Sequence, residues 1–254
     1  MRFRILGCGT STGVPRIGND WGLCDPDEPR NARLRTSLLV ESAGRRILVD
    51  CGPDLRQQLL AAKVGRLDGV IVTHAHGDHC HGIDELRPVS QAIGGPVPIH
   101  ARSDVLDELK LRFEYAFEQS DFYRPIVEAH VLDEELAFAE TKIRFVDQPH
   151  GGATSLGLRF DEIGYSVGYA VDFSELSDDM AAIYEGVDVW VADCLTRQPH
   201  PTHMHLDGVL SAARELRVGQ VYLVHMGNGL DYRTLAAELP DWAAPAYDGL
   251  EFGS

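Results

Sequence analysis

The sequence predicts an α/β (α+β) fold in which two mixed β-sheets pack face to face, with helices on the outside. Apolar runs of strand length occur as close pairs around short turns, which is typical of antiparallel hairpins. Other apolar runs are separated by segments of helical period, which is typical of parallel crossover units. With 254 residues, 44% of them hydrophobic, the chain can bury a large core. Without a composition break or linker, we expect one domain over residues 1–254.

The first half of the chain is expected to alternate strands with helices. The expected strands are residues 2–6, 36–41, 46–50, 69–73 and 96–100, of which the second and third form a hairpin around Ser42-Ala43-Gly44. The expected helices are residues 54–63, 82–93 and 104–118. Asp54 can cap the first of these helices. The last is amphipathic, with its apolar face formed by Leu106, Leu109, Phe113 and Phe117.

The second half begins with an ambiguous stretch, residues 121–147, which we expect to be rich in strands. Residues 156–160 and 165–171 are expected to form a further hairpin. Additional strands are predicted at residues 187–192, 221–224 and 246–249. Helices are predicted at residues 178–184, 207–216 and 232–239.

Composition limits where the protein works and what it binds. The N-terminal residues lack the apolar core of a signal peptide, and no run approaches the length of a membrane span. Five cysteines without regular spacing favour free, mostly buried thiols and a cytoplasmic location. The formal net charge is −16, or about −12 with two divalent ions bound. Such an acidic chain repels long polyanions, which argues against nucleic acid as the main substrate.

The most informative motif is His74-Ala75-His76-Gly77-Asp78-His79, which follows the apolar residues 69–72. Three imidazoles and a carboxylate this close together repel one another when protonated and lose solvation when buried. A divalent cation removes both problems, because neutral imidazole and carboxylate are its natural ligands. The motif therefore predicts a metal site at the end of a strand.

Three further polar residues directly follow apolar strands: His150, Asp172 and His225. Their order and spacing after His-x-His-x-Asp-His resemble the metallo-β-lactamase superfamily. The resemblance implies an αββα sandwich. It also implies that one ion is bound by His74, His76 and His150, and the second by Asp78, His79 and His225, with Asp172 bridging the ions. Zn²⁺ or Mn²⁺, or else Fe²⁺, fits such N/O ligands, and a water or hydroxide between the ions would be the nucleophile.

The stretch from Pro29 to Ser37 carries three arginines, Arg30, Arg33 and Arg35. One interpretation is a solvated basic loop. The alternative is a forked clamp for the phosphate oxygens of a substrate.

Another stretch, from His200 to Asp207, contains His203 and His205 ahead of a predicted helix. A histidine close to the metals but outside their ligand set can protonate a leaving group. Together with the small-residue loop from Gly7 to Gly13, which lacks a phosphate-loop lysine, these segments resemble the phosphodiesterase branch that acts on phosphoribosyl 1,2-cyclic phosphate. The resemblance implies catalytic roles for His203, as general acid, and for Asp78. His205 is interpreted as a surface residue.

Relatives in that branch often carry an accessory structural zinc, held by three cysteines near the N-terminus and one distant histidine. Here only Cys24 remains, and the histidine position corresponds to Asn228. One cysteine cannot hold a tetrahedral zinc, so no structural zinc is expected.

The resemblance thus favours hydrolysis of a small cyclic phosphodiester, such as 5-phosphoribosyl 1,2-cyclic phosphate or a 2′,3′-cyclic nucleotide. The alternatives are a tRNA 3′-processing nuclease, a thioester hydrolase and a non-catalytic binding protein on the same fold. The expected partner is a small phosphorylated substrate rather than duplex nucleic acid or a membrane, and a homodimer fits the general preference of oligomers.

Overall fold

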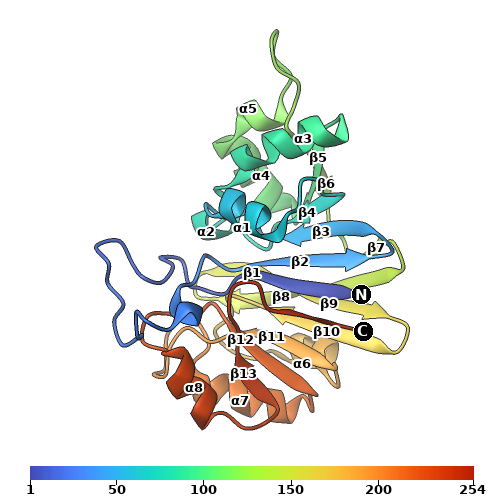
Figure 1. Cartoon of the computed structure of the whole chain (residues 1–254). Helices are drawn as coiled ribbons and strands as arrows, with labels where there is room; N and C mark the ends of the chain where they lie inside the picture. Colours follow the sequence, from blue (N-terminus) through green and yellow to red (C-terminus); the bar gives the residue numbers. More distant parts are fainter.

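Two seven-stranded mixed sheets form the centre of the protein, as the computed structural model shows for residues 1–254 (Figure 1). The first sheet has the order β14-β1-β2-β3-β4-β5-β6 and the second β13-β12-β11-β10-β9-β8-β7. The strands of the first are β1 (Arg2–Gly7), β2 (Ser37–Ser42), β3 (Arg45–Val49), β4 (Gly69–Ile71), β5 (Val97–Ala101), β6 (Val127–Val131) and β14 (Glu251–Gly253). Those of the second are β7 (Glu135–Phe138), β8 (Thr141–His150), β9 (Ala153–Glu162), β10 (Tyr165–Ala170), β11 (Val189–Asp193), β12 (Gln220–Val224) and β13 (Ala243–Pro245). The predicted pair of mixed sheets is confirmed.

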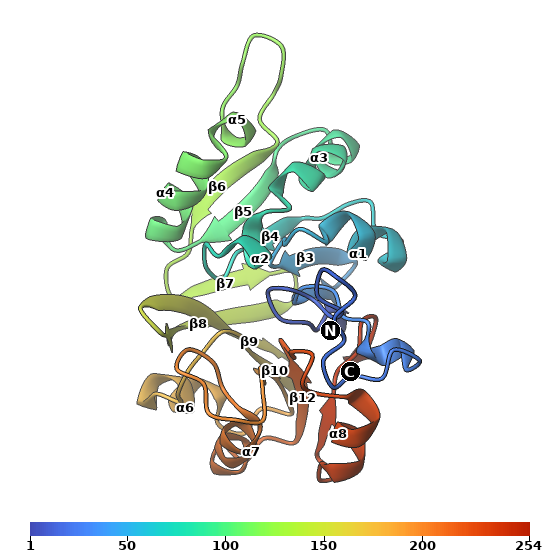
Figure 2. The ribbon, with the colours of Figure 1, turned by 90° about the vertical axis from the view of Figure 1, so that its left-hand side faces the viewer.

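Helices cover the outer face of each sheet (Figures 1 and 2). On the first sheet they are α1 (Leu55–Ala62), α2 (Gly77–Cys80), α3 (Arg87–Ile93), α4 (Ser103–Arg112) and α5 (Glu114–Phe117), with a 3₁₀ turn η2 (Ile83–Leu86) before α3. On the second they are α6 (Asp178–Tyr184), α7 (Leu206–Glu215) and α8 (Tyr232–Glu238). A short 3₁₀ turn, η1 (Pro29–Asn31), lies in the loop before β2. None of the helices is long and apolar enough to cross a membrane.

The two sheets are buried on both faces, and strand β2 shows how the sequence achieves this. Leu38 and Val40 belong to the cluster that lies between the sheets, whereas Leu39 belongs to the cluster beneath the helices of the first sheet. Because successive side chains of a strand point to opposite faces, one apolar run serves both clusters. The five cysteines are all buried and unpaired.

Two of the predicted helices are divided. The helix expected at residues 104–118 breaks at Phe113, whose ψ of 35° departs from helical geometry, so α4 and α5 are separate. The helix expected at residues 82–93 is split into η2 and α3. Pro88 stands in the first turn of α3, where its missing N–H leaves no helical hydrogen bond unmade.

Two further expectations are wrong in detail. Residues 246–249, predicted as a strand, form the turn between β13 and β14. Asp54 precedes α1 as predicted but makes no capping hydrogen bond. Its carboxylate instead accepts hydrogen bonds from the backbone N–H and the guanidinium of Arg35.

Candidate metal centre and adjoining cavity

The strand ends of both sheets bring the predicted metal ligands to one place. His74 and His76 lie in the loop after β4, and His150 is the last residue of β8. Asp172 and His225 follow β10 and β12, each in the left-handed backbone conformation, with φ of 58° and 56°. A residue other than glycine rarely adopts this conformation unless its surroundings enforce it. The two strained positions turn the chain sharply where the side chains meet.

Four of the side chains form the first group of donors: His74, His76, His150 and Asp172. The Nε2 atoms of His74 and His150 lie 3.3 and 3.4 Å from Oδ2 of Asp172. His74 Nε2 also lies 2.9 Å from Nδ1 of His76. The ring nitrogens of three histidines therefore point at one small volume beside a carboxylate oxygen.

A second group shares Asp172 with the first and adds Asp78, His79 and His225. His79 Nε2 lies 3.2 Å from Oδ2 of Asp78, and His225 Nε2 lies 3.2 Å from Oδ1 of Asp172. Asp172 faces the first group and His79 with Oδ2 and faces His225 with Oδ1, so its carboxylate lies between the two groups. A carboxylate in this position would suit two ions.

The donors fit divalent cations. Two ligands about 2.1 Å from a tetrahedral ion are separated by about 3.4 Å, close to the spacings between these atoms. Several donors are also buried without any hydrogen-bond partner, among them His79 Nε2 and Asp172 Oδ1. Buried polar atoms are almost always satisfied, so these positions fit a bound cation. The seven residues predicted from the sequence are the ones that the structure brings together.

The charges of the cluster affect one another strongly. Burial disfavours protonation of His79, but the carboxylates of Asp50, Asp172 and Asp78 outweigh it and raise the pKa of His79. Burial raises the pKa of Asp78, but His79 and His225 outweigh it and hold that pKa below its ordinary value. Burial lowers the pKa of His150 to about 4, which favours the neutral form that binds metals.

Hydrogen bonds behind the cluster orient its rings. Nδ1 of His79 lies 2.7 Å from Oδ2 of Asp50, a fully buried carboxylate that also accepts from the backbone N–H of Thr73. Nδ1 of His150 donates to the carbonyl of Thr202 over 2.8 Å. In both rings Nε2 is left facing the cluster, where its electron pair can bind a metal ion. Sequence reasoning missed Asp50, although it directly follows β3 as Asp172 follows β10.

His203 stands beside the cluster. Its Nδ1 lies 2.8 Å from Oδ2 of Asp193, which is fully buried at the end of β11. Burial lowers the pKa of His203 and raises that of Asp193. Asp193 was also missed in the sequence, although a polar residue after an apolar strand was the signal that identified Asp172 and His225. The arrangement leaves Nε2 of His203 free to exchange a proton.

These groups open into a cavity of about 490 Å³. It is lined by Ser11, His76, Asp78, His150, Gly152, Ala153, Asp172, Thr202, His203 and His225. His205 does not line it and instead occupies the N-cap position of α7. The small-residue loop from Gly7 to Gly13 contributes Ser11 to the wall of the cavity. This loop packs so closely on its neighbours that a Cβ at Gly9 would lie 2.9 Å from the carbonyl oxygens of Arg33 and Leu34, so glycine is required there.

The predicted arginine clamp is wrong for Arg33 and does not form as expected for the other two. Arg33 is 2% exposed, and its guanidinium donates to the carbonyls of Gly227 and Leu230. Because all of the cation faces protein, Arg33 has a structural role.

Arg30 binds Glu28 and lies over the ring of Tyr232, 4.0 Å from its centre. Arg35 pairs with Asp54 and donates to the carbonyl of Ser11. None of the three arginines lines the cavity.

Hydrogen bonds and an ion pair tie down the loop from Gly18 to Pro29. Arg16 pairs with Asp20, and the side chain of Asn228 contacts Oδ1 of Asp20 at 3.3 Å. The sulfur of Cys24 accepts a long contact from Arg33, 3.8 Å away.

Comparisons with known proteins agree with this architecture. The profile of the beta-lactamase superfamily domain matches residues 45–226. The crystal structure of a new diphosphatase from the PhnP family superposes with a TM-score of 0.90 and 34% identity, covering 99% of this chain and 97% of that one.

Two curated relatives match over less of their length. An octanoyltransferase of Porphyromonas gingivalis is 30% identical over 99% of this chain and 51% of its own. A ribonuclease Z of Bradyrhizobium diazoefficiens is 50% identical over 33% of this chain and 24% of its own. The chain thus spans about half of the first relative and a quarter of the second.

Proposed function

Because the chain belongs to the beta-lactamase superfamily and has the metallo-β-lactamase fold, we propose that it uses two divalent metal ions to hydrolyse a small cyclic phosphodiester. The family and the similarity to a diphosphatase support the assignment as a hydrolase. The observation that carries the finer assignment is the pair of His203 and Asp193 beside the metal-ligand cluster. It provides a proton donor, which hydrolysis of a phosphoric ester with an alkoxide leaving group needs.

The metal-ligand cluster divides naturally between the two ions. One would be held by His74, His76 and His150, the other by Asp78, His79 and His225, and Asp172 would contact both. When bound, such ions neutralise phosphate oxygens and lower the pKa of water, which favours hydrolysis near neutral pH. Zn²⁺ and Mn²⁺ both suit the ligands, and Fe²⁺ is compatible with them.

The protein's own part in the reaction centres on proton transfer. Asp193 holds the proton of His203 on Nδ1 and fixes the ring at the wall of the cavity. A proton on Nε2 can then pass to the departing sugar oxygen as water adds to phosphorus, so that the ring opens to a single product with a phosphate monoester and a free hydroxyl. His205 lies outside the cavity and has no such access.

The substrate is proposed to be small. The cavity of about 490 Å³ falls within the usual size of small-molecule sites. With no arginine in its wall, the metal ions and the loop around Ser11 would provide the contacts to phosphate. The formal net charge of −16 disfavours a long nucleic acid. A 5-phosphoribosyl 1,2-cyclic phosphate or a 2′,3′-cyclic nucleotide fits these limits.

One alternative has a specific observation in its favour. The neighbour with 34% identity is a diphosphatase, so hydrolysis of a diphosphate bond is the second candidate. The same ions would serve it, but His203 would contribute less, because a departing phosphate oxygen needs a proton less than an alkoxide does.

The test is turnover by the full chain reconstituted with Mn²⁺ or Zn²⁺, with its metal content counted. The substrates are 2′,3′-cyclic AMP, 5-phosphoribosyl 1,2-cyclic phosphate, ADP-ribose, a pre-tRNA and a thioester. The matched variants are His203→Ala and His205→Ala. We expect cyclic phosphodiesters to be cleaved fastest, with the rate lost in His203→Ala and kept in His205→Ala.

Preference for ADP-ribose would transfer the assignment to the diphosphatase candidate. Cleavage of pre-tRNA or the thioester alone, or no turnover by fully metallated protein, would refute the proposal.

A further inference from the structure

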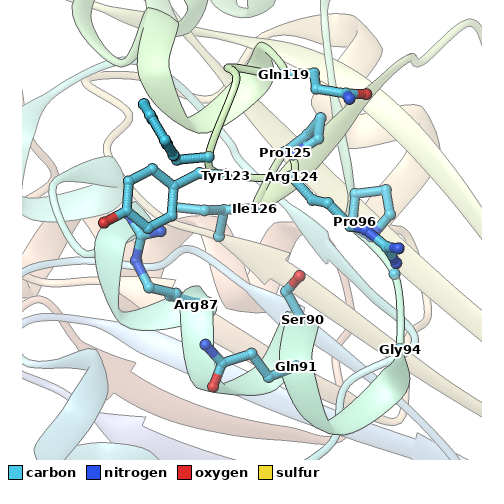
Figure 3. A pocket seen from close by; sticks show the side chains of 12 residues that line it. Arg87, Ser90, Gln91, Gly94, Pro96, Gln119, Tyr123, Arg124, Pro125 and Ile126 are labelled. Atoms are coloured by element: carbon cyan, nitrogen blue, oxygen red, sulfur yellow. The ribbon is translucent and has the colours of Figure 1, made fainter.

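A second cavity, of about 500 Å³, lies at the opposite end of the first sheet from the metal-ligand cluster. It adjoins Gly94 and Pro96, which precede β5, whereas His74 follows the parallel neighbour β4. Figure 3 shows side chains of α3 on one side and of the loop after α5 on the other. We call it the arginine cavity and use six of its lining residues: Arg87, Ser90, Gln91, Gln119, Tyr123 and Arg124.

The cavity is cationic in an acidic protein. It is lined by two arginines and by no acidic residue. Most arginines and lysines of the chain pair with a carboxylate. Arg87 and Arg124 form no ion pair, although acidic residues outnumber basic ones by 39 to 23. Figure 3 shows their guanidiniums on opposite sides of the cavity, Arg87 beside Tyr123 and Arg124 beside Pro96. Each provides forked donors for phosphate or carboxylate oxygens.

Aromatic rings complete the rim. Tyr123 is 67% exposed, and its ring centre lies 5.7 Å from the guanidinium carbon of Arg87. Phe122 beside it is 88% exposed. The hydroxyl of Ser120 accepts from the backbone N–H of Tyr123, which helps to hold the turn. Exposed rings of this size leave a flat apolar surface free for a planar ligand to stack on.

The floor and walls offer neutral hydrogen-bonding groups. In Figure 3, Ser90 and Gln91 extend from α3, and Gln119 lies on the opposite side of the cavity. Their side chains take part in no hydrogen bond within the protein. A hydroxyl and amides of this kind can donate to and accept from the edges of a heterocycle or the hydroxyls of a sugar.

From these contacts we propose that the arginine cavity binds a nucleoside monophosphate or a ligand of the same chemistry, in which a phosphate is joined to a planar ring. Arg124 holds the phosphate, Tyr123 with Arg87 beside it stacks on the planar ring, and the neutral polar side chains contact the edge of the ring. The inference stands independently of the proposed hydrolysis, because none of these residues belongs to the metal-ligand cluster or its cavity.

Isothermal titration of the metal-loaded full chain tests the proposal. The probes are AMP, ribose 5-phosphate and inorganic phosphate. The variants are Arg87→Gln/Arg124→Gln, Tyr123→Ala and a charge-matched control, Arg56→Gln/Lys110→Gln, at exposed residues outside the cavity. Turnover of each variant is measured alongside.

We expect Arg87→Gln/Arg124→Gln to weaken AMP binding by about tenfold or more, whereas the control variant binds AMP like the wild type. The rate of turnover should be unchanged in both variants. Tyr123→Ala should weaken the binding of AMP but leave the binding of ribose 5-phosphate unaffected. Equal AMP affinity in Arg87→Gln/Arg124→Gln and the control would overturn the proposal. So would inorganic phosphate binding as tightly as AMP, because the ring would then play no part.

Discussion

Asp193 contacts two histidines with its two carboxylate oxygens. Oδ2 lies 2.8 Å from Nδ1 of His203, and Oδ1 lies 3.7 Å from Nδ1 of His225. One histidine stands outside the metal-ligand cluster and the other within it. A single buried carboxylate therefore lies between the proposed proton donor, whose ring it orients through a hydrogen bond, and a proposed metal ligand.

Replacing Asp193 by Asn should impair proton transfer more than metal binding. The amide can donate to Nδ1 of His203, which favours the wrong tautomer of the ring. We expect kcat at saturating metal to fall by about a hundredfold on a cyclic nucleotide, the lower end of general-acid contributions. The measurement compares kcat of the wild type and of Asp193→Asn on the cyclic nucleotide and on bis-p-nitrophenyl phosphate, whose leaving group needs no proton. The loss should be small on the second substrate. An equal loss on both substrates would contradict the positioning role.

Asp50 should govern the metal affinity of the site. Its carboxylate lies 2.7 Å from Nδ1 of His79 and accepts from Thr73, so it fixes the ring whose Nε2 faces Asp78 and Asp172. Asp50→Asn should weaken metal binding by about 10–100-fold, as loss of such a partner usually does. Metal titration monitored by competition with a chelating dye measures this. Asp68→Asn, at a surface carboxylate, is the control. Unchanged affinity in Asp50→Asn would refute the role.

The sequence predicts most of the fold because the two sheets are made of apolar runs with clear period. The apolar run of β2 is visible without a structure, and it is continuous because Leu38 and Leu39 face different cores. The break at Phe113 is less visible, because its ring packs against the same core as α4 and the apolar spacing continues through it. Tertiary packing, rather than local propensity, decides such a boundary.

Only part of the site was predictable from the sequence. The ligand motif from His74 to His79 is contiguous, so its chemistry is apparent in the sequence. Asp193 carries the same strand-end signal as Asp172, but no local feature separates a ligand from the residue that orients it. The burial of Arg33 depends on the carbonyl of Gly227, which is 194 residues away in the chain. Contacts of that range leave no trace in local pattern.

Arg33 should matter for stability rather than for substrate affinity. Arg33→Met would leave the carbonyls of Gly227 and Leu230 and the side chain of Asn31 without their donor. We expect the free energy of unfolding to fall by about 3 kcal/mol, because buried acceptors lose a charged partner. Urea denaturation measures the loss, with Arg56→Met at an exposed site as control. A raised KM with unchanged stability would instead restore the phosphate-clamp interpretation.

Glu28 should give the loop before β2 a distinct dependence on pH. Its carboxylate binds Arg30 at 2.7 Å and Arg233 at 2.5 Å. The hydrogen bond from Arg30, opposed by burial and assisted by Arg233, lowers the pKa of Glu28 to about 2. The pKa of an unfolded glutamate is about 4.3. Because the folded pKa is depressed, the stabilisation is complete above the unfolded pKa and is lost as pH falls toward 2.

Glu28→Gln should therefore be less stable than the wild type at pH 7, and the difference should shrink between pH 5 and pH 3. Urea midpoints of both proteins across this range, with a chelator present so that metal loss does not contribute, provide the measurement. Glu215→Gln, at an exposed glutamate without an ion pair, should track the wild type throughout. A gap between wild type and Glu28→Gln that stays constant down to pH 3 would show that Glu28 acts through its shape and not through its charge.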